Sequence, residues 1–88
     1  MGNGKISNKT RNDLTYALEK ELDTRDKRYM FLRLEFKDFL YNLNIEGSPR
    51  DIAWDIYRYF EKQCMIGELI ETMNVKFDYN IKLELENE

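Results

Sequence analysis

The stretch SPRDIAWDIYRYFEKQCMIGELIETM, residues 48–73, decides the fold class of this chain. Ser48, Pro49 and Asp51 are the residue types of an N-cap, a first helical position and an acidic third position. Behind them, apolar side chains recur three and four residues apart, as on one face of a helix: Ile52, Ala53, Ile56, Tyr57, Phe60 and Cys64. A second short amphipathic segment follows, with Gly67 near its start. Its apolar positions are Leu69, Ile70 and Met73. We therefore expect two closely spaced helices here.

Helical patterns are also present upstream. Ser7 or Asn8 is a suitable N-cap for a first helix running to about Leu22. Its inward stripe is Leu14, Ala17, Leu18 and Leu22. After a polar break at 23–26, helical periodicity resumes from about Arg25 to Asn42. Its apolar stripe is broad, with Met30, Leu34 and Tyr41 on one line, widened by Phe31, Leu32, Phe36, Phe39, Leu40 and Leu43. This breadth predicts burial on more than one side, or two helices joined by a kink near residues 33–36.

The last segment has a different period. From Val75 to Glu86 apolar and polar residues alternate, which is typical of a strand with one apolar face. A frayed helix, with Phe77, Ile81 and Leu85 four apart, is the alternative. A lone strand would pair with another chain or fold back along the bundle. We expect an all-α, compact bundle of about five to six helices over residues 7–74. A flexible N-terminus (1–6) would precede it, and a C-terminal segment (75–88; strand, frayed helix or linker) would follow.

Composition argues against catalysis. The 88 residues include no histidine and one cysteine, Cys64. Histidine is the commonest general base and metal ligand, so we assign no catalytic, cofactor-binding or metal-ligating residue and do not expect an enzyme. Cys64 continues an apolar stripe and is interpreted as a buried structural thiol. No apolar run has the length of a membrane span, and the N-terminus lacks a secretory signal, so we expect a cytoplasmic protein without a membrane partner.

Three segments together resemble a known family. They are DLTYALEKEL (residues 13–22), the Leu-rich stretch after it, and GSPRDIAWDIYRYFEKQCMIGELIETM (residues 47–73). The pattern is similar to that of death-like helical domains of prokaryotic conflict systems, namely effector-associated domains and bacterial caspase-recruitment-like domains. The residues that carry it are Leu14, Ala17, Leu18, Tyr57, Phe60, Gly67, Leu69 and Ile70. The resemblance implies a death-fold-like bundle that binds other death-like domains and brings an effector, often a protease, to a sensor in antiphage defence.

Charge is unevenly distributed along the chain. Residues 1–37 contain nine Lys and Arg against six Asp and Glu, whereas residues 38–88 contain five against eleven. A basic cluster could face the acids of a neighbouring copy, and such head-to-tail contacts propagate into filaments unless they close. The candidate interface residues are Arg25, Lys27, Arg28, Arg33, Asp51, Trp54, Asp55, Arg58, Glu61, Glu68 and Glu71. The alternatives are a solvated helix surface for the charges and a core-edge position for Trp54.

The predicted function is a non-catalytic interaction module that self-associates or docks onto another death-like domain to recruit an effector. Nucleic acid is not an expected partner, because the chain is acidic overall and the basic cluster is short. The alternative is a small homodimeric structural or regulatory protein, such as an enzyme inhibitor, that pairs through its C-terminal strand. The two differ in whether self-association responds to salt.

Overall fold

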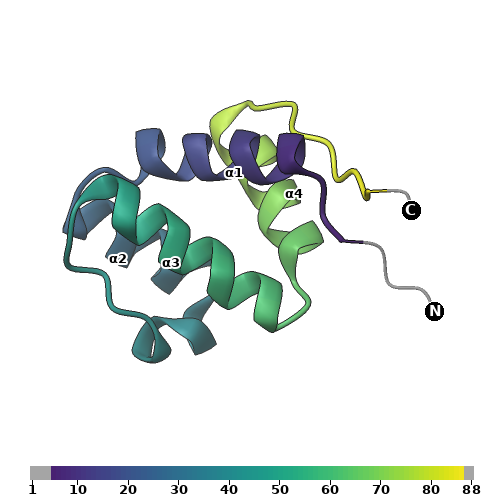
Figure 1. Cartoon of the computed structure of the whole chain (residues 1–88). Helices are drawn as coiled ribbons and strands as arrows, with labels where there is room; N and C mark the ends of the chain where they lie inside the picture. Colours follow the sequence, from purple (N-terminus) through teal and green to yellow (C-terminus); the bar gives the residue numbers. More distant parts are fainter. Residues whose placement is uncertain (1–4, 87–88) are drawn as a thin grey trace.

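The computed structural model describes residues 5–86 and confirms an all-α bundle. Its elements are α1 (Asn8–Glu21), α2 (Arg25–Glu35), the 3-10 helix η1 (Lys37–Asn42), α3 (Pro49–Lys62) and α4 (Ile66–Phe77). Helix α1 packs along α3, and α4 contacts both (Figure 1). Within the described residues the only β pairing is an isolated bridge between Ile6 and Leu85.

Three helices begin at hydroxyl N-caps. The side chains of Ser7, Thr24 and Ser48 each accept a hydrogen bond from the backbone N–H three residues later. Such caps satisfy one of the donors left open at a helix start. Pro49 occupies the first turn of α3, where its missing N–H has no cost. The helix starts predicted at residues 7–8 and 48–49 are therefore confirmed.

The helical stretch expected between residues 25 and 42 is divided. Helix α2 ends at Glu35, and the next residue, Phe36, has a φ of −142° and a ψ of 60° that interrupt the α conformation before η1. This confirms two helices joined by a kink. The buried face of α2 carries Phe31 and Leu32, whereas Met30 and Leu34 are 47% and 63% exposed. The line through Met30, Leu34 and Tyr41 is therefore not the core face.

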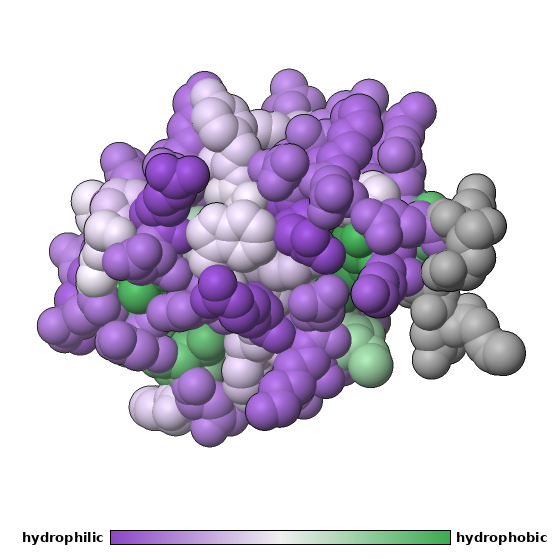
Figure 2. Space-filling model, viewed as in Figure 1, coloured by the Kyte–Doolittle hydropathy of each residue, from purple (hydrophilic) through white to green (hydrophobic). Residues whose placement is uncertain are grey.

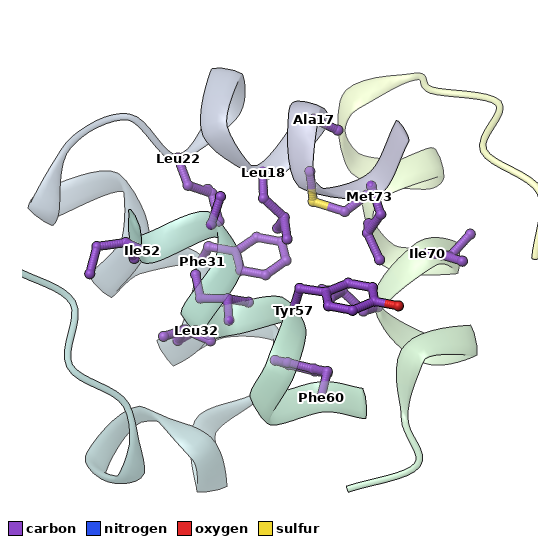
Figure 3. Close-up of a cluster of buried hydrophobic side chains, with 14 of the residues drawn as sticks. Ala17, Leu18, Leu22, Phe31, Leu32, Ile52, Tyr57, Phe60, Ile70 and Met73 are labelled. Atoms are coloured by element: carbon purple, nitrogen blue, oxygen red, sulfur yellow. The ribbon is translucent and has the colours of Figure 1, made fainter. Parts of the chain in front are cut away.

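The core is one cluster to which all four α-helices contribute. Figure 3 shows Leu18 of α1, Phe31 of α2, Tyr57 of α3 and Met73 of α4 meeting at its centre. Phe60 extends the cluster towards η1, because its ring meets the ring of Phe36 edge-on at a centroid distance of 4.7 Å. Aromatic pairs of this geometry add to the stabilisation from buried area alone.

Helix α3 ends in a Schellman turn. The Cys64 N–H donates to the Glu61 carbonyl (3.0 Å), and the Met65 N–H donates to the Phe60 carbonyl (2.9 Å). Cys64 takes the left-handed conformation that this turn requires, with a φ of 60°, and is exposed. The prediction of a buried structural thiol is wrong, because the helix stops at Lys62 and its next turn never forms.

Beyond α4 lies the C-terminal tail (residues 78–86), which is extended and folds back along the bundle. The side-chain amide of Asn74 holds both backbone groups of Ile81, each at 2.9 Å. The Thr10 hydroxyl donates to the Lys82 carbonyl (2.7 Å) and accepts from the Glu84 N–H (2.9 Å). Neither the strand nor the frayed helix predicted from Val75 onward is present as such. Residues 75–77 complete α4, and the rest follows the folded-back alternative.

The two ends of the described chain pair with each other. The Ser7 N–H donates to the Glu84 carbonyl (2.8 Å), and the Glu86 N–H donates to the Lys5 carbonyl (2.7 Å). In Figure 1 the purple and yellow segments accordingly leave the bundle on the same side. Of the N-terminus predicted to be flexible, residues 1–4 lie outside the described residues. Lys5 and Ile6 are held in this pairing.

Candidate interaction site

Arg28, the central residue of the basic cluster predicted as an interface, is buried in the structure. Arg28 is 2% exposed. Its Nε donates to the Leu22 carbonyl (2.8 Å), and its Nη1 donates to the carbonyls of Ile45 (2.9 Å) and Gly47 (3.1 Å). Burial lowers the pKa of this guanidinium from its usual value. Arg28 therefore cannot be an interface cation. It ties the end of α1 to the connection between η1 and α3.

Most of the remaining basic cluster is paired within the chain. Arg25 lies 3.1 Å from the carboxylate of Glu46, and Lys27 lies 3.0 Å from that of Asp23. The hydrogen bond from Lys27 holds the pKa of the Asp23 carboxyl below its usual value. Arg33 is exposed and makes no ion pair within residues 5–86. Internal pairing weakens the positive patch that the sequence suggested.

The predicted acidic and aromatic residues lie mainly on α3. Asp51, Asp55 and Arg58 are exposed, and Arg58 pairs with Asp55 at 3.4 Å. Trp54 is half-buried. Its indole meets the ring of Tyr57 edge-on at 5.8 Å, and the Arg58 guanidinium lies 5.6 Å from the indole centroid. Trp54 thus closes one edge of the core and keeps a partly open face beside charged neighbours.

The other predicted acids extend past the end of α3. Glu61 lies in the last turn of that helix, and Glu68 and Glu71 lie on the first half of α4. All three are exposed. Figure 2 shows hydrophilic side chains spread over most of the visible face, with small apolar areas between them. The visible face is therefore mainly polar.

The structure instead contains an apolar groove that sequence reasoning did not identify. This α2–α4 groove has a volume of about 380 Å³. Its residues come from the end of α1 and from helices α2 and α4: Glu21, Leu22, Asp26, Lys27, Met30, Phe31, Leu34, Lys76 and Phe77. The rings of Phe31 and Phe77 stack at 6.2 Å and join the two helices. Met30 and Leu34 lie one turn apart on α2, and their exposure adds apolar surface beside this contact.

The groove follows from how α2 is oriented. Arg28, Phe31 and Leu32 lie at helical spacing on its inner face and are all buried. Met30 and Leu34, on an adjacent line, remain outside. The unusually broad apolar stripe was the signal in the sequence, because one bundle contact covers only part of such a stripe.

Residues 5–86 contain no cluster of three or more metal-ligating side chains. No helix in this part of the chain combines the length and apolar character needed to cross a membrane. Comparison with known proteins gives no match to a family model, to a curated protein or to a solved structure.

Proposed function

We propose that this chain is a non-catalytic protein-interaction module that binds a helix of its partner in the α2–α4 groove. The partner is another death-like domain or a second copy of the chain, and the association recruits an effector such as a protease in prokaryotic antiphage defence. The sequence resemblance supports this class of partner. The setting proposed is the cytoplasm, where the exposed thiol of Cys64 stays reduced.

The observation that carries the proposal is the exposure of Met30 and Leu34 beside Phe77. Large apolar side chains grouped at a groove mark interaction sites more often than single exposed ones do. An amphipathic helix can bury such a group by placing residues one turn apart between the two helices. Asp26 and Lys76 lie at the groove as well and supply charges of both signs for orientation.

A docking event of this kind needs no chemistry. Holding an effector near a sensor raises its effective concentration, and the resulting increase in local encounters is the biological output. An apolar contact also predicts an association that salt does not weaken, whereas the charge-patch interface expected from the sequence would weaken as salt screens it.

The test compares the variant Leu34→Glu with the control Tyr41→Gln, which removes an exposed apolar side chain (87% exposed) outside the groove. Self-association is measured by sedimentation velocity over concentration and salt. Heterologous binding is measured by pull-down from native host extract with the wild type and both variants as bait. The proposal predicts that Leu34→Glu alone loses the association or the retained partner. Equal behaviour of the two variants would refute the groove as the binding site.

A further inference from the structure

The C-terminal tail has an outer edge with open backbone groups. The hydrogen bonds to Thr10 and the N-terminal residues use the backbone of Lys82, Glu84 and Glu86. Alternate residues of a strand direct their N–H and C=O groups to opposite edges. Those of Leu83 and Leu85 therefore lie on the other edge of the tail, the edge on which Asn74 binds Ile81. Neither residue's backbone has a hydrogen-bond partner among residues 5–86.

The side chains of the two leucines on this edge are about half exposed to solvent. Leu83 and Leu85 are 48% and 53% exposed. They lie beside Ile6 and Ile66 in a groove of about 510 Å³ near the turn between α3 and α4. Ile81, the previous apolar residue of the tail, is by contrast buried and has its backbone satisfied by Asn74. The open part of the tail is thus limited to Leu83 and Leu85.

We propose that this edge pairs with the same edge of a second copy, antiparallel and about a two-fold axis at Glu84. In this register Leu83 lies opposite Leu85 of the second copy, and each pair exchanges both N–H···O bonds. Every outward N–H and C=O of the two leucines is then satisfied in both copies. A shift by two residues that places Leu85 opposite Ile81 leaves groups of Leu85 unpaired, because Asn74 already binds the backbone of Ile81.

The charges along the tail agree with this register. Lys82 lies opposite Glu86 of the second copy, and the symmetry repeats this favourable pair. Glu84 lies opposite its own equivalent, which is unfavourable. Lys9 lies near Glu84, although its hydrogen bond to Asp13 is the main cause that raises the pKa of the Lys9 amine. The edge is therefore largely self-complementary, which favours a second copy over an unrelated strand.

The assembly closes at two copies. A two-fold interface uses the same surface on both chains and leaves neither copy with an open tail edge. The paired segment is short, so the interface is smaller than that of a permanent dimer. We expect a dimer that forms only at high protein concentration. This interface is separate from the α2–α4 groove and does not rest on the function proposed above.

The first test uses sedimentation velocity of the full chain over a wide concentration range. The wild type should approach a dimer and stop there. Leu83→Pro removes an outward N–H that the fold does not use, and Leu83→Val retains it. The proline variant should remain monomeric with an unchanged circular dichroism spectrum, and the valine variant should dimerise. A wild type that is monomeric throughout, or a folded proline variant that dimerises normally, would overturn the proposal.

A charge exchange tests the register without altering the backbone. Lys82→Glu places two acidic groups opposite each other and should weaken dimerisation about tenfold, from the loss of two cross-strand pairs. The double variant Lys82→Glu/Glu86→Lys restores opposite charges and should recover the wild-type constant. If the double variant stays as weak as the single one, the register is wrong. Self-association that is lost on Leu34→Glu but kept on Leu83→Pro belongs to the α2–α4 groove, and the converse pattern belongs to the tail edge, so failure of the groove and failure of the strand pairing are distinguishable.

Discussion

Replacing Arg28 by Met should destabilise the fold severely. The change keeps the length and apolar stem of the side chain but leaves three carbonyl oxygens without their donor. Those of Leu22 and Ile45 accept in buried hydrogen bonds, whereas the bond to Gly47 is only partly buried and water can replace the donor there. A buried acceptor left without a partner costs about 1–3 kcal/mol, so the expected loss in unfolding free energy is about 3 kcal/mol.

Such a loss is large for this chain. A domain of 88 residues has a free energy of unfolding of about 4–13 kcal/mol. With a urea slope of about 1–3 kcal/mol/M, the midpoint should fall by about 1–3 M. The assay is urea unfolding followed by circular dichroism. The matched control is Arg33→Met, on the exposed side of the same helix, for which the change should stay within about 0.5 kcal/mol. Equal midpoints for the two variants would refute the role assigned to Arg28.

Two further predictions concern single residues. Burial and the hydrogen bond to Glu21 raise the pKa of Tyr79 to about 12. The folded state therefore holds this proton more tightly, and stability should be lost as pH rises from about 10 to about 12. Melting temperatures of the wild type and Tyr79→Phe over this pH range should show a smaller decline for the variant, and identical declines would contradict the assignment. Cys64→Gly should stabilise the Schellman turn by about 0.5–1 kcal/mol, measured by urea unfolding, because glycine adopts a positive φ without strain. A lower midpoint for the glycine variant would count against that conformation.

Helix starts were predictable because their determinants are local. A serine cap bonds to the N–H three residues ahead, and Pro49 restricts its own backbone, so neither needs the rest of the fold. The helical period of α1, α3 and α4 was also sufficient to predict their buried faces, since each helix has one dominant apolar face. Leu14, Phe60 and Met73 are all buried as expected.

The orientation of α2 was harder to predict because its sequence offers two apolar lines. In the fold, the line that contains Phe31 and Leu32 is buried, and Arg28 is buried with it because it lies on the same face of the helix. Only the tertiary structure brings carbonyl groups within hydrogen-bond distance of Nε and Nη1 of the buried guanidinium, and Nη2 has no partner within residues 5–86. The α2–α4 groove depends on the same choice, since burial of the other line would have covered Met30 and Leu34.

The prediction that Cys64 is buried failed for a different reason. Helical periodicity continued through residue 64, and nothing in the apolar pattern marked the end of α3 at Lys62. A left-handed C-cap usually reveals itself by a glycine, and here the glycine comes three residues later, at Gly67. An unusual residue at the cap thus concealed the helix end.

The pairing of Lys5 with Glu86 determines how this chain responds to mechanical force. The segment 5–7 and the segment 84–86 are antiparallel, so Lys5 lies opposite Glu86 at the outer end of the pairing. Tension applied to the N-terminus and the C-terminus would therefore load the Glu86–Lys5 hydrogen bond first and the Ser7–Glu84 bond next. Bonds broken one after another resist far less than bonds sheared together. The tail would peel away at low force, while the helices remain packed until Asn74 releases Ile81.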